Sequence, residues 1–141
     1  TEGSKPIAVI FNLGVNDLEN AGNYISYMTN IASTLKSKNC KLFYMSVNPI
    51  NSIMITKAGR GARTEAQVRE FNSKIRSGLS LYYKYIDMYS VLMKKGYGTN
   101  ARYDGVDDGD DGLHYTTKTF KRIYYYCITY LNTGSINASY Y

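Results

Sequence analysis

The sequence predicts an α/β protein built on a parallel sheet. Three short apolar runs alternate along the chain with three longer segments of helical periodicity, and such an alternation gives βαβ crossovers and parallel strands. The chain has 141 residues, of which 44% are apolar and 20% are charged, as in an ordinary globular domain. These figures exclude a disordered chain, a collagen and a coiled coil. No apolar run approaches the ~20 residues that cross a bilayer, so no membrane span is expected.

The first part of the chain supplies two strands and the helix between them. Ala8 to Leu13 reads AVIFNL, which is long enough for a buried strand. Apolar residues at helical spacing then predict a helix with Tyr24, Met28, Ile31, Ala32 and Leu35 on one face. Asn20 or Asn23 is expected to cap it. Leu42 to Val47 predicts the second strand, which must end before Pro49 because proline cannot donate to a sheet.

A second helix and a third strand follow. Residues 50–63 are expected to form a long loop. Thr64 and Gln67 form a capping box, and the helix that it begins is expected to bury Val68, Phe71, Asn72, Ile75 and Leu79. Tyr83 to Tyr89 predicts the third strand.

The last part of the chain is a loop and a helix. Residues 94–113 are rich in glycine and aspartate and predict a loop. Thr116 is expected to cap a final helix. Its buried side is expected to hold Phe120, Ile123, Tyr124, Cys127, Ile128 and Leu131.

Two polar clusters follow predicted strands, where active sites of parallel sheets gather. In the second of them His114, the one histidine of the chain, comes three residues after Asp111. A carboxylate so placed can hold the Nδ1 proton and leave Nε2 as a general base. By itself this pattern also fits a surface histidine in a turn beside an aspartate.

The first cluster is Gly14 to Asp17. The side-chain amide of Asn16 can donate a hydrogen bond to an oxyanion that develops in a reaction. An ordinary loop asparagine is the alternative. Asp17 is expected to have a structural role, in which it accepts hydrogen bonds from the loop backbone.

In this order and setting, the clusters resemble conserved blocks of the SGNH (GDSL-type) hydrolase family. Gly14 to Asp17 matches the family's Gly-x-Asn-Asp block after a strand, and Asp111 to His114 matches its Asp-x-x-His block before the last helix. Tyr44 to Ile50 (YMSVNPI) looks like the family's fourth strand with its Ser-x-x-Pro ending. The resemblance covers residues 7 to 131.

The resemblance implies a three-layer α/β/α fold of flavodoxin-like type that hydrolyses carboxylic esters through Ser, His and Asp. On this interpretation Asp111 orients the imidazole, His114 is the base and Asn16 is one oxyanion donor. Gly14 lets the backbone turn close beside the site, with Asp17 supporting the loop. No cofactor and no metal is implied.

The sequence departs from the family in its nucleophile. The Gly-Asp-Ser block should precede Gly14 by some tens of residues, whereas thirteen residues precede it here. Ser4 lies on the wrong side of the first strand, and Ser46 lies inside a predicted buried strand. We therefore expect residues 1–141 to be the C-terminal portion of one SGNH-like domain. The N-terminal portion with the nucleophile is expected on another chain or in upstream sequence.

The family's strand order, 2-1-3-4-5, gives this expectation a physical consequence. The chain would hold only strands 3, 4 and 5, so that its first strand would be an exposed edge. A bare apolar edge invites pairing and aggregation. The expected partner is the N-terminal fragment of the same hydrolase that carries Gly-Asp-Ser.

The resemblance indicates a class of substrate but no single one. We expect an esterase acting on O-acyl groups of carbohydrates or cell-wall polymers. The alternative is a non-catalytic carbohydrate- or cell-wall-binding module on the same fold. Sixteen tyrosines and no tryptophan form an unusual composition, and we expect an extracellular or cell-surface protein.

Three further features bear on binding: the basic charge, the aspartates of residues 104–111 and the two cysteines. The net charge is +6, but the basic residues are scattered and do not interleave with aromatic ones, so a solvated surface is favoured over nucleic acid. Residues 104–111 hold five aspartates, which predict either a solvated acidic loop or a calcium site without EF-hand spacing. Cys40 and Cys127 are expected to be free thiols, with a bridge between them left open.

Overall fold

The computed structural model describes residues 5–98 and 111–139, and over these ranges the protein is a mixed α/β structure. The strands are β1 (Ile7–Phe11), β2 (Cys40–Met45) and β3 (Lys84–Ile86). They form one parallel sheet in the order β1-β2-β3. The predicted α/β class and parallel sheet are therefore confirmed.

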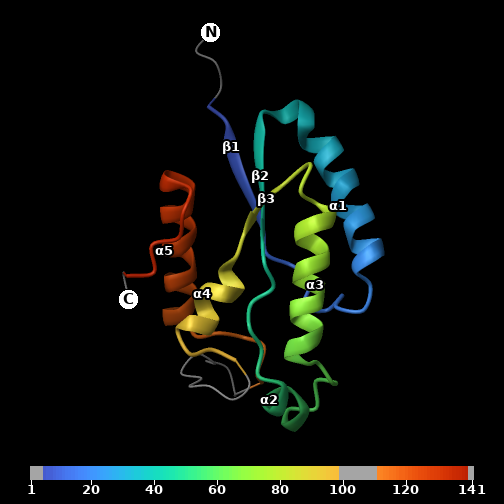
Figure 1. The fold of residues 1–141 in the computed structure, drawn as a ribbon, viewed down its shortest axis with the longest axis vertical. Coiled ribbons are helices and arrows are strands. Elements are labelled where there is room, and N and C mark those ends of the chain that lie inside the picture. Colours follow the sequence, from blue (N-terminus) through green and yellow to red (C-terminus); the bar gives the residue numbers. More distant parts are fainter. Residues whose placement is uncertain (1–4, 99–110, 140–141) are drawn as a thin grey trace.

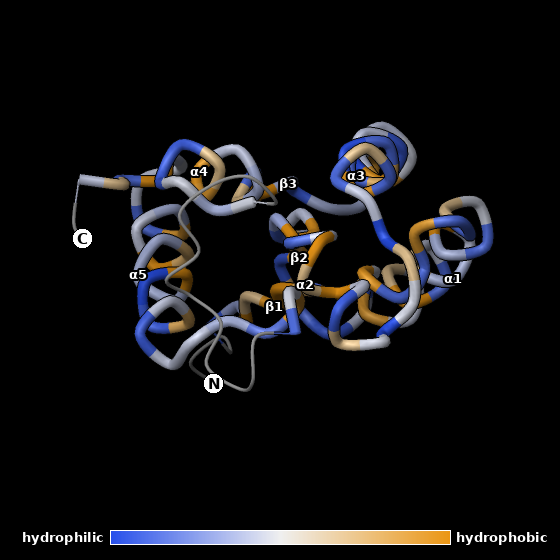
Figure 2. The backbone as a smooth tube through the Cα atoms, turned by 90° about the horizontal axis from the view of Figure 1, so that it is seen from below, coloured by the Kyte–Doolittle hydropathy of each residue, from blue (hydrophilic) through white to orange (hydrophobic). Residues whose placement is uncertain are grey.

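Helices cover both faces of the sheet (Figures 1 and 2). On one face lie α1 (Ala21–Leu35), which continues into the short 3-10 turn η1 (Lys36–Lys38), and α3 (Glu65–Gly78). On the other face lie α4 (Met88–Lys94) and α5 (Thr117–Thr133). Helix α2 (Ser52–Lys57) lies beyond the carboxyl ends of the strands (Figure 1). None of the helices in the described ranges is both long and apolar enough to cross a bilayer.

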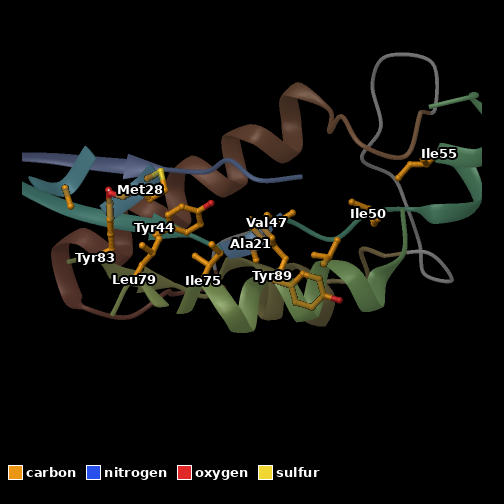
Figure 3. Packing of buried hydrophobic residues seen from close by; sticks show 13 residues of the cluster. Ala21, Met28, Tyr44, Val47, Ile50, Ile55, Ile75, Leu79, Tyr83 and Tyr89 are labelled. Carbon is orange, nitrogen blue, oxygen red and sulfur yellow. The ribbon is translucent and has the colours of Figure 1, made fainter. Parts of the chain in front are cut away.

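The side chains of β2 alternate between two hydrophobic cores. Tyr44 belongs to the core beneath α1 and α3, where Figure 3 shows it near Met28 and Ile75. Phe43 and Met45 belong to the core beneath α4 and α5. Successive residues of a strand point to opposite faces, so β2 anchors both helical layers.

Two predicted helix starts are confirmed, that of α3 at Thr64 and that of α5 at Thr116. Thr64 Oγ1 accepts a hydrogen bond from the backbone N–H of Gln67 at 3.2 Å, and Gln67 Oε1 accepts one from the Thr64 N–H at 2.9 Å. Thr116 Oγ1 accepts from the N–H of Thr119 at 3.1 Å and begins α5. Asn20 occupies the N-cap position of α1, but its side chain makes no capping bond.

Two predicted elements differ in part from the structure. The expected loop at residues 50–63 contains α2, whose start is capped by Asn51 Oδ1 accepting from the Met54 N–H at 3.2 Å. The expected strand at residues 83–89 is only three residues long, because Asp87 Oδ1 accepts from the Ser90 N–H at 3.1 Å and begins α4. In both places a capping side chain begins a helix that was not predicted.

The predicted buried face of α5 is also partly wrong. Ile123 and Cys127 are buried as expected, but Phe120 is 50% and Tyr124 62% exposed. Tyr126 is fully buried in their place. A tyrosine is both apolar and polar, so the pattern of residues 124–126 did not reveal which ring faces the sheet.

Within the described sheet, β1 is an edge strand. Its residues are exposed or half-buried, and the Ile7 side chain is 62% exposed. The exposed edge expected for the first strand is therefore present in the part of the chain that the structure describes.

Candidate functional site

The turn after β1 depends on Gly14. This residue has φ +113°, and a Cβ built on it would lie 2.5 Å from Cε1 of Phe71 in α3, so only glycine fits. The carbonyl of Gly14 accepts from the Asp17 N–H at 2.8 Å, and the Asp17 carbonyl accepts from the Asn20 N–H at 2.9 Å. The backbone of Asp17 thus builds the turn that presents Asn16 and leads into α1.

The Asp111–His114 loop is held against α2. Gly112 has φ +78°, and its carbonyl accepts a hydrogen bond from the Asn51 N–H at 3.0 Å. A Cβ on Gly112 would collide with the backbone oxygen of Asn51. The helix that the sequence did not predict therefore positions the loop with the candidate base.

Asp111 and His114 form a hydrogen-bonded pair. His114 Nδ1 lies 2.5 Å from Asp111 Oδ2, and an ionised carboxylate can only accept, so Nδ1 carries the proton. Asp111 Oδ1 accepts from the backbone N–H groups of Leu113 and His114 at 2.9 and 3.0 Å. The Asp111 side chain is 4% exposed and that of His114 is 57% exposed. The arrangement fixes a tautomer in which Nε2 has a free lone pair.

Asp111 stays ionised at neutral pH. Burial raises the pKa of its carboxyl. The hydrogen bonds from the backbone of His114 and Leu113 and from the His114 ring lower this pKa by a larger amount. The result is a pKa of about 2, below the ordinary 3.8. A carboxylate that is charged at neutral pH can stabilise an imidazolium at His114 during a reaction.

Arg60 is a second partner of the same carboxylate. Its Nε lies 3.3 Å from Asp111 Oδ2, the oxygen that also contacts His114. No sequence pattern pointed to Arg60, which lies in the loop expected at residues 50–63. The available signal was its place after the second predicted strand, at the edge of the sheet where both polar clusters were expected.

Arg63 holds Asn16. Arg63 Nη2 donates to Asn16 Oδ1 at 3.0 Å, Nε donates to the Val15 carbonyl at 3.1 Å, and Nη1 donates to the Arg60 carbonyl at 2.7 Å. A guanidinium has only donors, so the amide oxygen of Asn16 must face it and the Nδ2 group must point away. Arg63 lies at the end of the same expected loop, and no sequence pattern pointed to it either.

An apolar hollow of about 130 Å³ lies between the two loops. It is lined by Asn12, Leu13, Val15, Val47, Asn48, Pro49, Ile50, Leu113, Tyr115 and Phe120. Val15 precedes Asn16, while Leu113 and Tyr115 flank His114. Val15 of the first cluster and Leu113 of the second thus line one hollow, but Asn16 and His114 are not among its lining residues. Asn16 lines the hollow beside Arg60 and Arg63 instead.

Ser46, which directly follows β2, has a structural position. Ser46 is fully buried, and its Oγ accepts from the Tyr89 N–H at 2.7 Å. This agrees with its exclusion as a nucleophile. Ser4 lies outside the described residues.

Metal-ligating side chains do not gather in the described ranges: residues 5–98 and 111–139 hold no group of three or more His, Cys, Asp or Glu suited to an ion. The aspartates of residues 104–110 lie outside the described residues. Cys40 and Cys127 are free thiols. Burial raises the pKa of Cys127, whose Sγ lies 3.5 Å from Sδ of Met45.

Neither the models of known protein families nor the curated proteins include a match to this chain.

Proposed function

We propose that this chain is the histidine- and aspartate-bearing part of a serine esterase of the SGNH (GDSL) type. The observation that carries the proposal is the bond between His114 Nδ1 and buried Asp111 Oδ2 at 2.5 Å, which leaves Nε2 as the basic atom. The parallel sheet with helices on both faces supports the three-layer, flavodoxin-like fold of that family.

The proposed reaction gives one role to each of these groups. His114 Nε2 removes the proton of a serine hydroxyl as its oxygen attacks the ester carbonyl. Asn16 Nδ2 donates to the oxyanion of the tetrahedral intermediate. The imidazolium then gives its proton to the departing alcohol, and water activated by His114 hydrolyses the acyl-serine. Asp111 holds the ring and stabilises its charge throughout.

The serine comes, in this proposal, from an N-terminal portion of the same hydrolase that carries Gly-Asp-Ser. The open edge of β1 supports such a partner because it can accept a further parallel strand. Apolar side chains of β1 and of the residues after it are exposed: Ile7 is 62% and Leu13 is 57% exposed. A partner strand beside β1 would cover them and reach the carboxyl edge of the sheet.

The hollow supports a short acyl group as the part of the substrate held beside the reacting carbon. Its volume is about 130 Å³, and an apolar cavity of about 150 Å³ holds a molecule the size of benzene. Acetyl to butyryl esters fit this limit. O-acyl groups on carbohydrates or cell-wall polymers at the cell surface are the proposed substrates.

Labelling of the native protein with a fluorophosphonate tests the proposal. The protein is purified from its source without denaturant, treated with the probe and measured by intact mass spectrometry after denaturation. We expect a phosphonylated serine outside residues 1–141, on a co-purifying chain or on upstream sequence. The His114→Ala variant is the control, and it should lose most of the label because the serine loses its base.

Absence of label on native, folded protein would contradict the esterase assignment. The same fold would then be tested as a non-catalytic module, by binding to acylated and deacylated cell-wall polysaccharide.

A further inference from the structure

The guanidinium of Arg63 joins three acceptors that no sequence pattern linked. They are the side chain of Asn16, the backbone of Val15 and the backbone of Arg60, at 3.0, 3.1 and 2.7 Å. Two of these acceptors belong to the turn after β1, and the third belongs to the segment after α2. One planar side chain thus ties the candidate oxyanion loop to a segment 44 to 48 residues away in the sequence.

The carboxamide of Asn16 can donate to an oxyanion only if a contact holds it in one orientation. It lies on the surface of the turn, where an unrestrained carboxamide rotates between orientations that present oxygen and orientations that present nitrogen. An oxyanion is stabilised only by the nitrogen, and only when the donor is already aimed at it. Arg63 removes the wrong orientation because its donors pair with the oxygen.

The same segment also reaches the base. Arg60, whose carbonyl receives Arg63 Nη1, places its own Nε 3.3 Å from Asp111 Oδ2. Asp111 in turn holds His114 at 2.5 Å. A continuous chain of contacts therefore runs from Asn16 through Arg63, Arg60 and Asp111 to His114.

We propose that Arg63 is a positioning residue that orients the Asn16 amide for catalysis, and that the segment Arg60–Arg63 fixes this donor relative to the Asp111–His114 pair. The inference rests on the proposed esterase function and extends it to residues outside the family's motifs. It gives Arg63 no contact with the substrate.

The surroundings of Arg63 favour a role in orienting Asn16 and disfavour a role in binding an anionic substrate. It lines a hollow of about 240 Å³ together with Arg60, Gln67 and Glu19. Glu19 Oε1 accepts from Gln67 Nε2 at 3.1 Å, which keeps a negative charge on the wall of that hollow. An anion would meet this carboxylate as well as the arginines.

A double-mutant cycle in the complete hydrolase tests the coupling. Asn16→Ala is expected to lower kcat about 100-fold or more, as for loss of one oxyanion donor. Arg63→Met is expected to lower kcat about tenfold or more while KM changes less than about twofold, because only donor orientation is lost. In the Asn16→Ala background, Arg63→Met should cost nothing further.

Arg63→Lys separates geometry from charge. A lysine keeps the charge but has no planar fork to reach all three acceptors, so we expect its kcat to stay close to that of Arg63→Met. Full activity in the lysine variant, additive losses in the double variant, or a rise in KM at unchanged kcat would each overturn the proposal. Arg69→Met is the matched control, because it replaces another exposed arginine that does not contact Asn16. Its kcat should equal that of the wild type.

NMR of the complete hydrolase distinguishes failure of this inference from failure of the proposed function. The side-chain Nδ2 resonances of Asn16, assigned by their loss in Asn16→Ala, should move to free-amide positions in Arg63→Met and stay in place in Arg69→Met. Unchanged Asn16 resonances in Arg63→Met would overturn the positioning role even if the protein hydrolyses esters. Shifted resonances together with an absence of ester hydrolysis would keep the contact, but they would overturn its role in catalysis along with the esterase assignment.

Discussion

The exposed ring of His114 is hydrogen-bonded to the buried carboxylate of Asp111: Nδ1 lies 2.5 Å from Oδ2. The His114 side chain is 57% exposed and that of Asp111 is 4% exposed. The carboxylate is also held by two backbone N–H groups and by Arg60. The inner side of the pair is therefore rigid while the outer nitrogen of the ring is open to a reactant. This division suits a general base, whose position must be fixed and whose reactive atom must be accessible.

Asp111→Asn should remove a pH-dependent part of the stability. The pKa of Asp111 is about 2 in the folded protein against an ordinary 3.8, so its contribution is complete above about pH 4 and is lost as the pH falls toward 2. Linkage gives about 2 kcal/mol for such a shift. Urea unfolding between pH 2 and pH 7 measures it. Glu19→Gln is the control, and equal pH dependence in Asp111→Asn and wild type would refute the prediction.

Gly14→Ala should destabilise the fold more than Gly59→Ala. Both positions have positive φ, +113° and +66°, which costs an alanine about 1–2 kcal/mol. At Gly14 the new Cβ would also lie 2.5 Å from Phe71, whereas nothing lies within 4 Å at Gly59. We expect a loss of about 3 kcal/mol or more for Gly14→Ala, measured as the free energy of unfolding in urea. Equal losses at the two sites would show that the Phe71 contact relaxes freely.

Asn72→Ala should be costly although the residue carries no charge. The buried amide of Asn72 accepts from the Val47 N–H at 2.8 Å and donates to the Val47 carbonyl at 3.0 Å. Alanine leaves both backbone groups unpaired in a buried site, which costs about 2–4 kcal/mol. The exposed neighbour Ser73→Ala is the control. Chemical unfolding of both variants provides the comparison, and a loss below 1 kcal/mol in Asn72→Ala would mean that water replaces the amide.

Short-range signals were sufficient for part of the fold. The Thr64–Gln67 box and the Thr116 cap depend on residues three positions apart, and both formed as predicted. The short apolar runs identified β1 and β2 because a strand within a covered sheet is apolar on both sides. The caps at Asn51 and Asp87 have the same local form, but they stand in segments that were assigned as a loop and a strand by composition.

The supporting contacts of the site depend on tertiary structure. Asp111 and His114 are three residues apart, so their contact could be predicted from spacing. The contact of Arg63 with Asn16 joins residues 47 positions apart, and no pattern in a single sequence specifies it. The same holds for Tyr126, which is buried because of how α5 meets the sheet and not because of its residue type.

The most direct test of the account is the turnover of the proposed complete hydrolase with and without His114, its proposed base. Initial rates of p-nitrophenyl acetate hydrolysis are compared between wild type and His114→Ala at pH 8. His114 is exposed, so the variant should fold, and its urea unfolding curve checks this. The account predicts a fall in kcat of about 10⁴-fold, as for removal of a triad histidine. A folded His114→Ala protein that hydrolyses the ester at the wild-type rate would contradict the assignment of His114 as the base.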